Sequence, residues 1–307
     1  MHSASLSIEP LPPFRLDLTV WALRRRANNC TDRWDERVYR RILIVDGDTV
    51  EIAVEQAGHT QTPQLDLTVT GSCDVSRARA VVTPALERLL GFGINLGNFF
   101  QIAADDSALA PLAQRFSGFN PLRFPTLFEA LVNGIACQQV TLTLGILLLN
   151  RLAENFGPSM MGSAGRAHAF PQPENLAGQD PANLRKLGFS RQKAQAIIEL
   201  ADAIADGRLE LGRLETLKDE ELVGRLRQLR GIGRWTAEYV LLRGLGRLHV
   251  FPGDDVGARG NLRRWLDLAE PLDYAGVQRA LDRWRPYAGL VYFHLLLKRL
   301  AESGYVQ

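Results

Sequence analysis

The spacing of apolar residues changes once along this chain of 307 residues, and that change limits the folds open to it. Up to about Gly71, apolar and polar residues alternate, which is typical of strands with one buried and one solvated face. From about Thr126 onward, apolar residues recur every three or four positions, which is the helical pattern. Neither an all-helical bundle nor an all-β sandwich accommodates both patterns. The sequence therefore predicts an α+β fold, in which an N-terminal antiparallel β-sheet with helices is followed by an all-α region.

The sheet is predicted from four runs of alternating residues. Two of them, at 38–45 and 50–54, flank the segment Asp46-Gly47-Asp48. An Asp-Gly step between two such runs is typical of a β-hairpin. The other two runs cover residues 16–20 and 65–69.

Helices are expected after the last of these runs. The pattern is helical over 76–82 and again over 85–90, and Thr83-Pro84 provides a cap and a first-turn proline for the second helix. The stretch 91–125 contains glycine, asparagine and proline, and we interpret it as the connection to a second domain.

The rest of the chain is predicted as helices. Thr126 and Glu129 form a capping-box pattern at the start of a long helix, which Gly157-Pro158 closes, and a loop follows over 159–180. Caps and glycines delimit further helices at 181–188, 190–206, 216–229, 234–243, 256–266 and 274–302. We therefore expect two domains, an N-terminal α+β domain over residues 1–115 and a helical domain over residues 120–307.

Composition excludes several classes of protein. No apolar run approaches the ~18 residues that a membrane span needs, and the N-terminus lacks the basic start and apolar core of a signal peptide. Cys30, Cys73 and Cys137 are too few and too far apart for a disulfide framework, a CxxC metal site or an iron–sulfur cluster. His249 and His294 have no ligand partner at useful spacing, so we interpret both as structural. We expect a cytoplasmic, bacterial-type, nucleoid-associated protein without a membrane partner.

The distribution of charge is more informative than its sum. The net charge is +2, but residues 221–307 carry 14 basic and 9 acidic side chains, and 13 of the basic ones are arginine. Arginine is the better bidentate ligand of phosphate. On charge alone, this excess fits a nucleic-acid partner and a solvated basic helix face equally well.

The most informative segment is Leu229-Arg-Gly-Ile-Gly-Arg-Trp-Thr-Ala237. It predicts a helix, a tight turn at Gly231 and Gly233, and a second helix that starts at about Arg234. Two glycines permit a backbone conformation and a close approach that a Cβ would block. The N–H groups at the start of the second helix then favour an anion, such as one phosphate of a nucleic-acid backbone. Taken alone, the two glycines are equally typical of an ordinary helix–helix turn.

The residues around this turn give it a context. The pattern Leu-x-Gly-Ile-Gly-x-x-Thr-Ala is followed about 20 residues later by Val-Phe-Pro-Gly-Asp254-Asp255, and preceded by Ile135-Ala-Cys-Gln138-Gln139-Val140 and by the segment 184–197. Together these motifs resemble the helix-hairpin-helix DNA glycosylases, and are closest to the DNA-3-methyladenine glycosylase II (AlkA-like) branch. The resemblance covers roughly 120–300, and more weakly the N-terminal sheet. It implies a glycosylase domain in two helical subdomains with the active-site cleft between them.

The resemblance implies an activity as well as a fold. It implies a monofunctional DNA N-glycosylase of base excision repair, a DNA-3-methyladenine glycosylase II type hydrolase that flips out and excises alkylated purines of the 3-methyladenine and 7-methylguanine type. Asp255 is the catalytic candidate, because a carboxylate stabilises the positive charge that builds on the sugar. It is also placed to cap the helix at 256–266. Adjacent side chains should diverge, and the resemblance assigns the role to Asp255 and not to Asp254, because the catalytic aspartate of the family is the later of such a pair.

A base pocket is expected around aromatic side chains. Trp235 and Tyr239 are four residues apart on one helix and should share a face, and both suit stacking with an electron-poor base. Tyr292 and Phe293 are further candidates, because Leu296 stands where the AlkA pattern carries a tryptophan. Trp235 also occupies the position of the lysine with which bifunctional relatives form a Schiff base. An indole cannot form that imine, so we expect water to be the nucleophile.

The resemblance also implies the contacts with double-stranded DNA that contains alkylated bases. Gln139 aligns near the residue that fills the gap left by the flipped nucleotide. The DNA-binding candidates are Gln138, Gln139, Gly231, Gly233, Arg234 and Thr236. Arg24-Arg25-Arg26 is either a positive rim of the cleft, since the AlkA-like branch carries an arginine near this position beside the active site, or a solvated strand end. No cofactor is required, although the carbonyls of Arg227, Leu229 and Ile232 could hold a structural Na⁺ or K⁺ ion. We expect a monomer.

Two alternatives stay open at this stage. The chain could be a non-catalytic helix-hairpin-helix DNA-binding protein, although Asp255 in a loop facing DNA would then only repel phosphate. It could also be a glycosylase for oxidised purines, against which the missing lysine argues.

Overall fold

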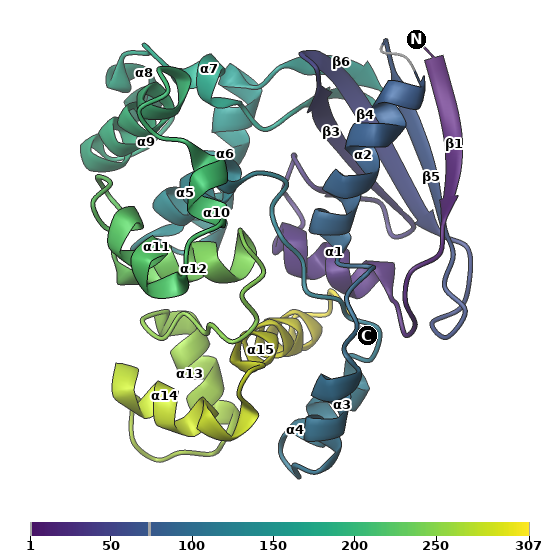
Figure 1. The fold of residues 1–307 in the computed structure, drawn as a ribbon, viewed down its shortest axis with the longest axis vertical. Helices are drawn as coiled ribbons and strands as arrows, with labels where there is room; N and C mark the ends of the chain where they lie inside the picture. Colours follow the sequence, from purple (N-terminus) through teal and green to yellow (C-terminus); the bar gives the residue numbers. More distant parts are fainter. Residues whose placement is uncertain (1, 73–74, 307) are drawn as a thin grey trace.

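In the computed structural model, residues 2–72 and 75–306 are described, and they contain one five-stranded sheet with helices on and beyond it (Figure 1). Every neighbouring pair in the sheet is antiparallel, in the order β1-β5-β4-β3-β2. The bounds are His2–Ile8 for β1, Arg33–Trp34 for β2, Val38–Val45 for β3, Asp48–Gln56 for β4 and Leu65–Gly71 for β5. The three strands expected at 38–45, 50–54 and 65–69 are confirmed, whereas β1 and β2 were not predicted. The prediction for Cys73 lies outside the described residues.

The strand expected at 16–20 is wrong, because this segment is the start of helix α1, Leu16–Arg24. Leu16, Leu18 and Val20 are almost inaccessible, and so is Thr19 between them. The alternation of leucine with polar residues therefore does not indicate a strand with one solvated face, because most sides of helix α1 are buried. As a consequence, the arginines at 24–26 lie at a helix end and not at a strand end.

The two helices expected at 76–82 and 85–90 form a single helix, α2, Val75–Leu90, which contains Pro84 in its interior and runs across the sheet in Figure 1. Val82, Leu86 and Leu89 are fully buried on both sides of the proline, so the packing face continues through it. The expected connection at 91–125 contains two further helices, α3 (Gly97–Ala104) and α4 (Leu109–Arg115). Their buried residues Phe99 and Leu109 join the hydrophobic core.

From residue 126 on, the helical prediction is confirmed in type but corrected in its boundaries. The expected long helix consists of α5 and α6, because Gln138 and Gln139 leave the helical conformation and Thr141 caps a new start. The helix expected at 274–302 is interrupted by a 3₁₀ turn and a proline at 286. The expected loop at 159–180 contains a small hairpin and a short helix.

The elements of this part are α5 (Leu127–Cys137), α6 (Leu142–Phe156), β6 (Ser159–Gly162), β7 (Gly165–His168), α7 (Pro173–Leu176), α8 (Pro181–Lys186), α9 (Arg191–Ala205), α10 (Leu211–Glu215), α11 (Asp219–Leu226), α12 (Arg234–Arg243), α13 (Val256–Trp265), α14 (Tyr274–Leu281), η1 (Asp282–Trp284) and α15 (Ala288–Glu302). The helix expected at 216–229 begins only at Asp219, because Thr216 ends α10. Helix α12 has the bounds that the sequence predicted.

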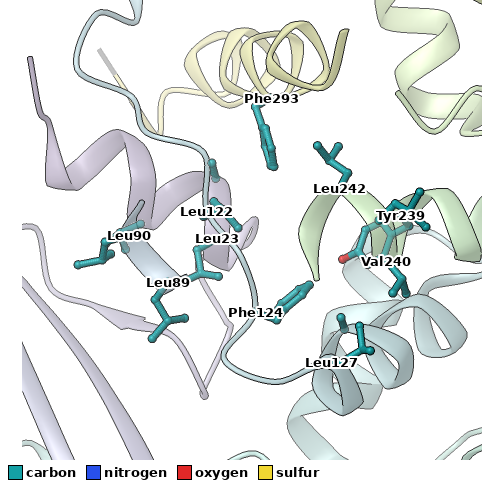
Figure 2. Close-up of a cluster of buried hydrophobic side chains, with 14 of the residues drawn as sticks. Leu23, Leu89, Leu90, Leu122, Phe124, Leu127, Tyr239, Val240, Leu242 and Phe293 are labelled. Atoms are coloured by element: carbon teal, nitrogen blue, oxygen red, sulfur yellow. The ribbon is translucent and has the colours of Figure 1, made fainter. Parts of the chain in front are cut away.

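One cluster of buried side chains runs from the sheet-side helices into the helical part. Figure 2 shows Leu23 of α1 and Leu89 of α2 on one side of it, and Tyr239 of α12 and Phe293 of α15 on the other. The predicted boundary between 115 and 120 stays a prediction, and so does the division of the helical part into two subdomains. A domain boundary at this point would cut through a hydrophobic core that both parts share.

A buried ion-pair network also joins the two parts. The Arg41 guanidinium on β3 lies 2.6 Å from an Asp32 carboxylate oxygen and 2.5 Å from one of Glu129 on α5. Tyr39 donates a hydrogen bond to the same Asp32 oxygen at 2.8 Å. All four side chains are buried. In the parts of the chain that the structure describes, no helix is both long enough and apolar enough to cross a bilayer.

Candidate active site

The turn between α11 and α12 has the geometry that its glycines predicted. Gly231 has φ +77°, and a Cβ at this position would lie 2.9 Å from the Cβ of Ala196 on α9. Gly233 is extended, with φ −93° and ψ −177°, and is the N-cap of α12. A Cβ on Gly233 would meet no protein atom within 4 Å. Packing within the chain therefore explains the first glycine but not the second.

The N-terminus of α12 is open. Its first helical hydrogen bond runs from the Ala237 N–H to the Gly233 carbonyl, at 3.0 Å. The N–H groups of the three residues before Ala237 therefore precede the helical ladder, and no side chain caps them. This arrangement suits an anion, as the sequence analysis expected.

Asp255 is positioned by the helix that it starts. As the N-cap of α13 it accepts a hydrogen bond from the Ala258 N–H through Oδ1, at 2.8 Å. Its other oxygen, Oδ2, accepts from Trp235 Nε1 at 3.2 Å and from the Tyr292 hydroxyl at 3.3 Å. Both of these distances are long for their donors. Oδ1 thus holds the start of α13. Oδ2 faces Trp235 and Tyr292, and its two long hydrogen bonds there can be replaced by contacts with a ligand.

Asp254 points away from its neighbour. Its Oδ2 accepts a hydrogen bond from Arg234 Nε at 2.6 Å, and the Arg234 guanidinium lies 3.9 Å from the centroid of the Tyr274 ring. The divergence of the two carboxylates agrees with the sequence-based expectation. It also means that Arg234, a predicted DNA contact, carries its own counterion at the surface.

Three of the predicted pocket residues lie together. The rings of Trp235 and Tyr239 are 5.4 Å apart at an angle of 32°. Tyr292 and Trp235 both donate to Asp255 Oδ2, and Tyr292 lines the same cleft as Trp235 and Tyr239. Burial, reinforced by the negative charge of Asp255, raises the pKa of the Tyr292 hydroxyl well above its usual range, so that it stays a donor. Leu296 also lines this cleft, whereas Phe293 is fully buried against Phe119 and contributes to the core instead.

A cleft of about 1210 Å³ brings these groups together with the turn between α5 and α6. Asp255 and the Gln138–Gln139 segment line the same cleft, as the hypothesis of a DNA glycosylase requires. The volume exceeds the roughly 300–1,000 Å³ of a pocket for one small ligand. There is room for a base and part of the backbone that carries it.

Arg25 lies in the cleft, where the family resemblance implies an arginine beside the active site. It is only 4% exposed, lines the cleft, and donates from Nη1 to the Tyr239 hydroxyl at 2.9 Å and from Nη2 to Asn133 Oδ1 at 2.7 Å. Burial raises the pKa of Tyr239, although the nearby Arg25 cation opposes the shift. The solvated strand end is wrong for Arg24 and Arg25, since both side chains are buried at the end of a helix, whereas Arg25 and Arg26 do line the cleft. The N-terminal part reaches the floor of the cleft and not merely its rim.

Two predicted DNA contacts are used inside the protein. Gln138 donates from Nε2 to the Gly231 carbonyl and to the Thr236 hydroxyl, both at 2.6 Å. Thr236 is 1% exposed, so its side chain supports the hairpin and does not reach a phosphate. Their side chains are thus engaged with each other, while the Thr236 N–H remains among the open donors at the start of α12, and both residues stay predicted DNA contacts. Gln139, in contrast, is exposed and has φ +52°.

The remaining predictions concern the two histidines, which were interpreted as structural, and the hairpin carbonyls, which were predicted to hold a cation. His294 is buried among phenylalanine rings and its Nδ1 bonds the Leu290 carbonyl at 2.8 Å, while His249 pairs with Asp219 at the surface. Within the described residues no group of three or more His, Cys, Asp or Glu side chains is placed to hold a metal ion. At the predicted cation site, the Leu229 carbonyl accepts a hydrogen bond from the Ile232 N–H at 3.2 Å, and the cation site itself stays a prediction.

A glycine hairpin ahead of an open helix N-terminus, a capping aspartate and an aromatic cleft together define a DNA glycosylase of the helix-hairpin-helix class. The comparisons with known proteins agree. The family model described as "HhH-GPD superfamily base excision DNA repair protein" matches residues 132–286, half of the chain. The chain belongs to this superfamily, and its resemblance to the AlkA-like branch is confirmed by relatives that are named DNA-3-methyladenine glycosylases.

Three of these relatives illustrate the extent of the similarity. YfjP of Bacillus subtilis, named as a candidate DNA-3-methyladenine glycosylase, is 28% identical over 291 residues, which are 95% of this chain and 97% of that protein. DNA-3-methyladenine glycosylase 2 of Escherichia coli is 30% identical over 177 residues, 57% of this chain and 59% of its own. The structure of a 3-methyladenine DNA-glycosylase from Archaeoglobus fulgidus superimposes with a TM-score of 0.85 at 26% identity, covering 97% of this chain and 99% of that one.

Proposed function

We propose that this chain is a monofunctional DNA N-glycosylase that flips out alkylated purines of the 3-methyladenine and 7-methylguanine type and releases them by hydrolysis. The observation that carries the proposal is the position of Asp255. Its Oδ2 faces Trp235 and Tyr292 in the cleft, while Oδ1 is fixed by the start of α13. A carboxylate held in this way serves as a fixed negative charge beside a reacting sugar.

The chemistry follows from that charge. When the bond between C1′ and the base nitrogen breaks, its electron pair leaves with the base, and positive charge remains on the sugar. The Asp255 carboxylate stabilises this charge more in the transition state than in the ground state, which is what accelerates the step. Water then bonds to C1′ and gives up a proton, which leaves an abasic site. A base that is already cationic leaves as a neutral molecule, so it needs little further assistance.

The pocket is suited to such a base. The half-buried Trp235 ring offers a stacking surface that attracts an electron-poor or cationic ring, and Tyr239, which is 2% exposed, packs against it from within. No lysine stands at the start of α12, and the amine of Lys193 on α9 donates to the carbonyls of Ala136 at 2.9 Å and Gln138 at 2.7 Å. This engagement supports water, and not an amine, as the nucleophile.

The remaining parts of the cleft supply the grip on double-stranded DNA. In this proposal the N–H groups around Gly233 bind one backbone phosphate, and Gln139 fills the gap in the duplex. We further propose that the protein acts as a cytoplasmic monomer and needs no cofactor, with a structural Na⁺ or K⁺ ion on the carbonyls of Arg227, Leu229 and Ile232 as an accessory.

The proposal is tested by incubating the purified protein with methylated duplex DNA and, in parallel, with a duplex that contains 8-oxoguanine. We expect release of methylated purines, strand breakage only after alkali or heat, and no enzyme–DNA adduct after borohydride treatment. Binding of DNA without any base release would support a non-catalytic DNA-binding protein. Release of 8-oxoguanine in preference to methylated bases, or a trapped adduct, would overturn the substrate class or the monofunctional mechanism.

A further inference from the structure

The turn between α5 and α6, residues 138–141, is held in place from two sides. From α9, the Lys193 ammonium donates to the carbonyls of Ala136 and Gln138, which belong to the C-terminal end of α5. A cation at this end of a helix is stabilised by the partial negative charge of its last carbonyls. The backbone just before Gln139 is therefore fixed by a residue that comes from another helix.

From the other side, the Gln138 amide bridges the turn to the hairpin. A single nitrogen, Nε2, reaches both the carbonyl of Gly231 and the hydroxyl of Thr236, at 2.6 Å each. These two acceptors lie on either side of Gly233, so the amide spans the part of the hairpin that presents N–H groups. The cleft thereby acquires a direct connection between its two proposed DNA contacts.

The two connected parts do not depend equally on this bridge. The hairpin has other supports, since Ala196 packs against Gly231, Thr236 packs against Gly134, and Ile232 is 6% exposed. In the turn, Gln139 and Thr141 are exposed, and Gln139 is held in a left-handed conformation that residues other than glycine rarely adopt. Loss of the bridge should therefore release the turn much more than the hairpin.

We propose that Gln138 and Lys193 are positioning residues that fix the Gln139-bearing turn relative to the hairpin, so that gripping a phosphate and filling the gap left by a flipped nucleotide occur together. This inference rests on the proposed function. Neither residue touches the reacting atoms. Each acts through Gln139, and the coupling between the residues is what an experiment can measure.

The experiment is a double-mutant cycle on the full chain. Gln138→Met removes the donor with little change in side-chain length, and Gln139→Ala removes the exposed side chain; each is measured alone and both together. The first readout is the fluorescence of 2-aminopurine placed next to a methylated base in a duplex, which reports flipping. The second is the single-turnover rate of base release, and the third is affinity for a lesion-free duplex.

We expect each single variant to lower flipping and base release about tenfold, as loss of roughly one or two net hydrogen bonds would. The double variant should be about as impaired as either single one, because Gln138 has nothing left to position. Affinity for the lesion-free duplex, which reports the hairpin, should change less than about threefold. Lys193→Met should behave like Gln138→Met. The matched controls Gln195→Met and Lys186→Met, at positions away from the turn, should retain the wild-type values.

Several outcomes would overturn the proposed positioning role of Gln138 and Lys193. Additive losses in the double variant, about a hundredfold, would mean that the two residues act independently. Equal loss of lesion-free binding and of flipping in Gln138→Met would assign the amide to the hairpin alone. Thermal unfolding of each variant separates these results from a global loss of structure, and Gln139→Ala, at an exposed position, keeps the cycle interpretable. Wild-type protein that releases no methylated base would instead overturn the proposed function.

Discussion

Two helix ends bring arginine-rich segments to the same cleft, and they do so in opposite ways. The start of α12 carries Arg234 at the surface, paired with Asp254, and leaves its N–H groups open. The end of α1 carries Arg25, which is 4% exposed and bonded to Tyr239 and Asn133. The first end is built to meet a partner. The second supports the wall against which the partner is held.

This difference explains why the hairpin was predictable from local sequence, whereas only the family resemblance indicated an arginine beside the cleft at the end of α1. The hairpin is specified by neighbours in sequence, namely two glycines and a following helix start. Arg25 is specified by residues 108 and 214 positions away, which local patterns do not encode. The predictions below test whether the two ends divide the work between binding and catalysis in this way, starting with the largest expected effect.

The largest effect should come from Asp255→Asn. The amide keeps the shape of the side chain but removes the negative charge, and loss of one such electrostatic contribution commonly costs about 10²–10³ in rate. Single-turnover release of a methylated purine measures the loss. DNA affinity should persist or rise, because a charge that repels phosphate is gone. Full activity of this variant would remove Asp255 from the mechanism and leave the hairpin end with binding alone.

The packing of the N-terminal part against the helical part should weaken in acid. Burial lowers the pKa of His294 to about 4 from an ordinary 6.5, so the native protein keeps it neutral while the unfolded chain protonates it. The stabilisation is complete above pH 6.5 and is lost as the pH falls towards 4; at about 1.4 kcal/mol per pKa unit it amounts to roughly 3 kcal/mol.

Urea unfolding at pH 7 and at pH 4.5 measures this loss of stability. The variant His294→Leu should lose less stability between the two pH values than the wild-type protein, because carboxylates contribute equally to both. An identical pH dependence in the two proteins would show that His294 is not buried as a neutral group.

Arg25→Met sharpens the comparison further, because it should separate activity from stability. Removal of the guanidinium leaves Tyr239 and Asn133 without their donor, and we expect about 2 kcal/mol of lost transition-state stabilisation, a decrease of roughly thirtyfold in base release. The free energy of unfolding should fall by less than this, because removing a buried guanidinium offsets part of the cost of leaving the two acceptors unsatisfied.

The adjacent Arg26→Met is the control for this variant. Parallel loss of stability and activity in Arg25→Met would reduce Arg25 to a structural residue and remove the contrast between the two helix ends.

A smaller effect is expected for Gly233→Ala. A Cβ at this position meets no protein atom within 4 Å, so the fold should be unchanged. If a phosphate approaches the backbone here, the methyl group should weaken binding several-fold on every duplex, with or without a lesion, because the contact reads no base. Titration at low and moderate salt checks this. Unchanged affinity would remove the hairpin from the binding surface.

The smallest effect should belong to Asp254→Asn. This residue only holds Arg234 at the rim, in a half-exposed ion pair of the kind worth about 0–1 kcal/mol. Base release should stay within about threefold of wild type. A loss equal to that of Asp255→Asn would mean that the two carboxylates share the role assigned to one of them.

The fold and the site were predictable to the degree that their determinants are local. The strands at 38–45, 50–54 and 65–69, the bounds of α12 and the capping role of Asp255 all follow from residues close in sequence. Helix α1 was not predictable, because its alternation imitates a strand and its burial on most sides comes from distant elements. For the same reason the sequence could not distinguish an exposed Gln139 from Gln138, whose amide is occupied by the hairpin.

The ion pairs of Arg41 bear on how proteins of this kind can be recombined. One guanidinium pairs with both Asp32 beside the sheet and Glu129 on α5, and removing one partner of a buried pair typically costs about 3–5 kcal/mol. A helical part grafted onto a different N-terminal module would carry Glu129 into the junction without its counterion. Such a chimera would need an arginine from the new module at the same point, or an apolar residue in place of Glu129. The exchange of modules is thus constrained by a buried cation as well as by the shared hydrophobic core, whatever the linker between them.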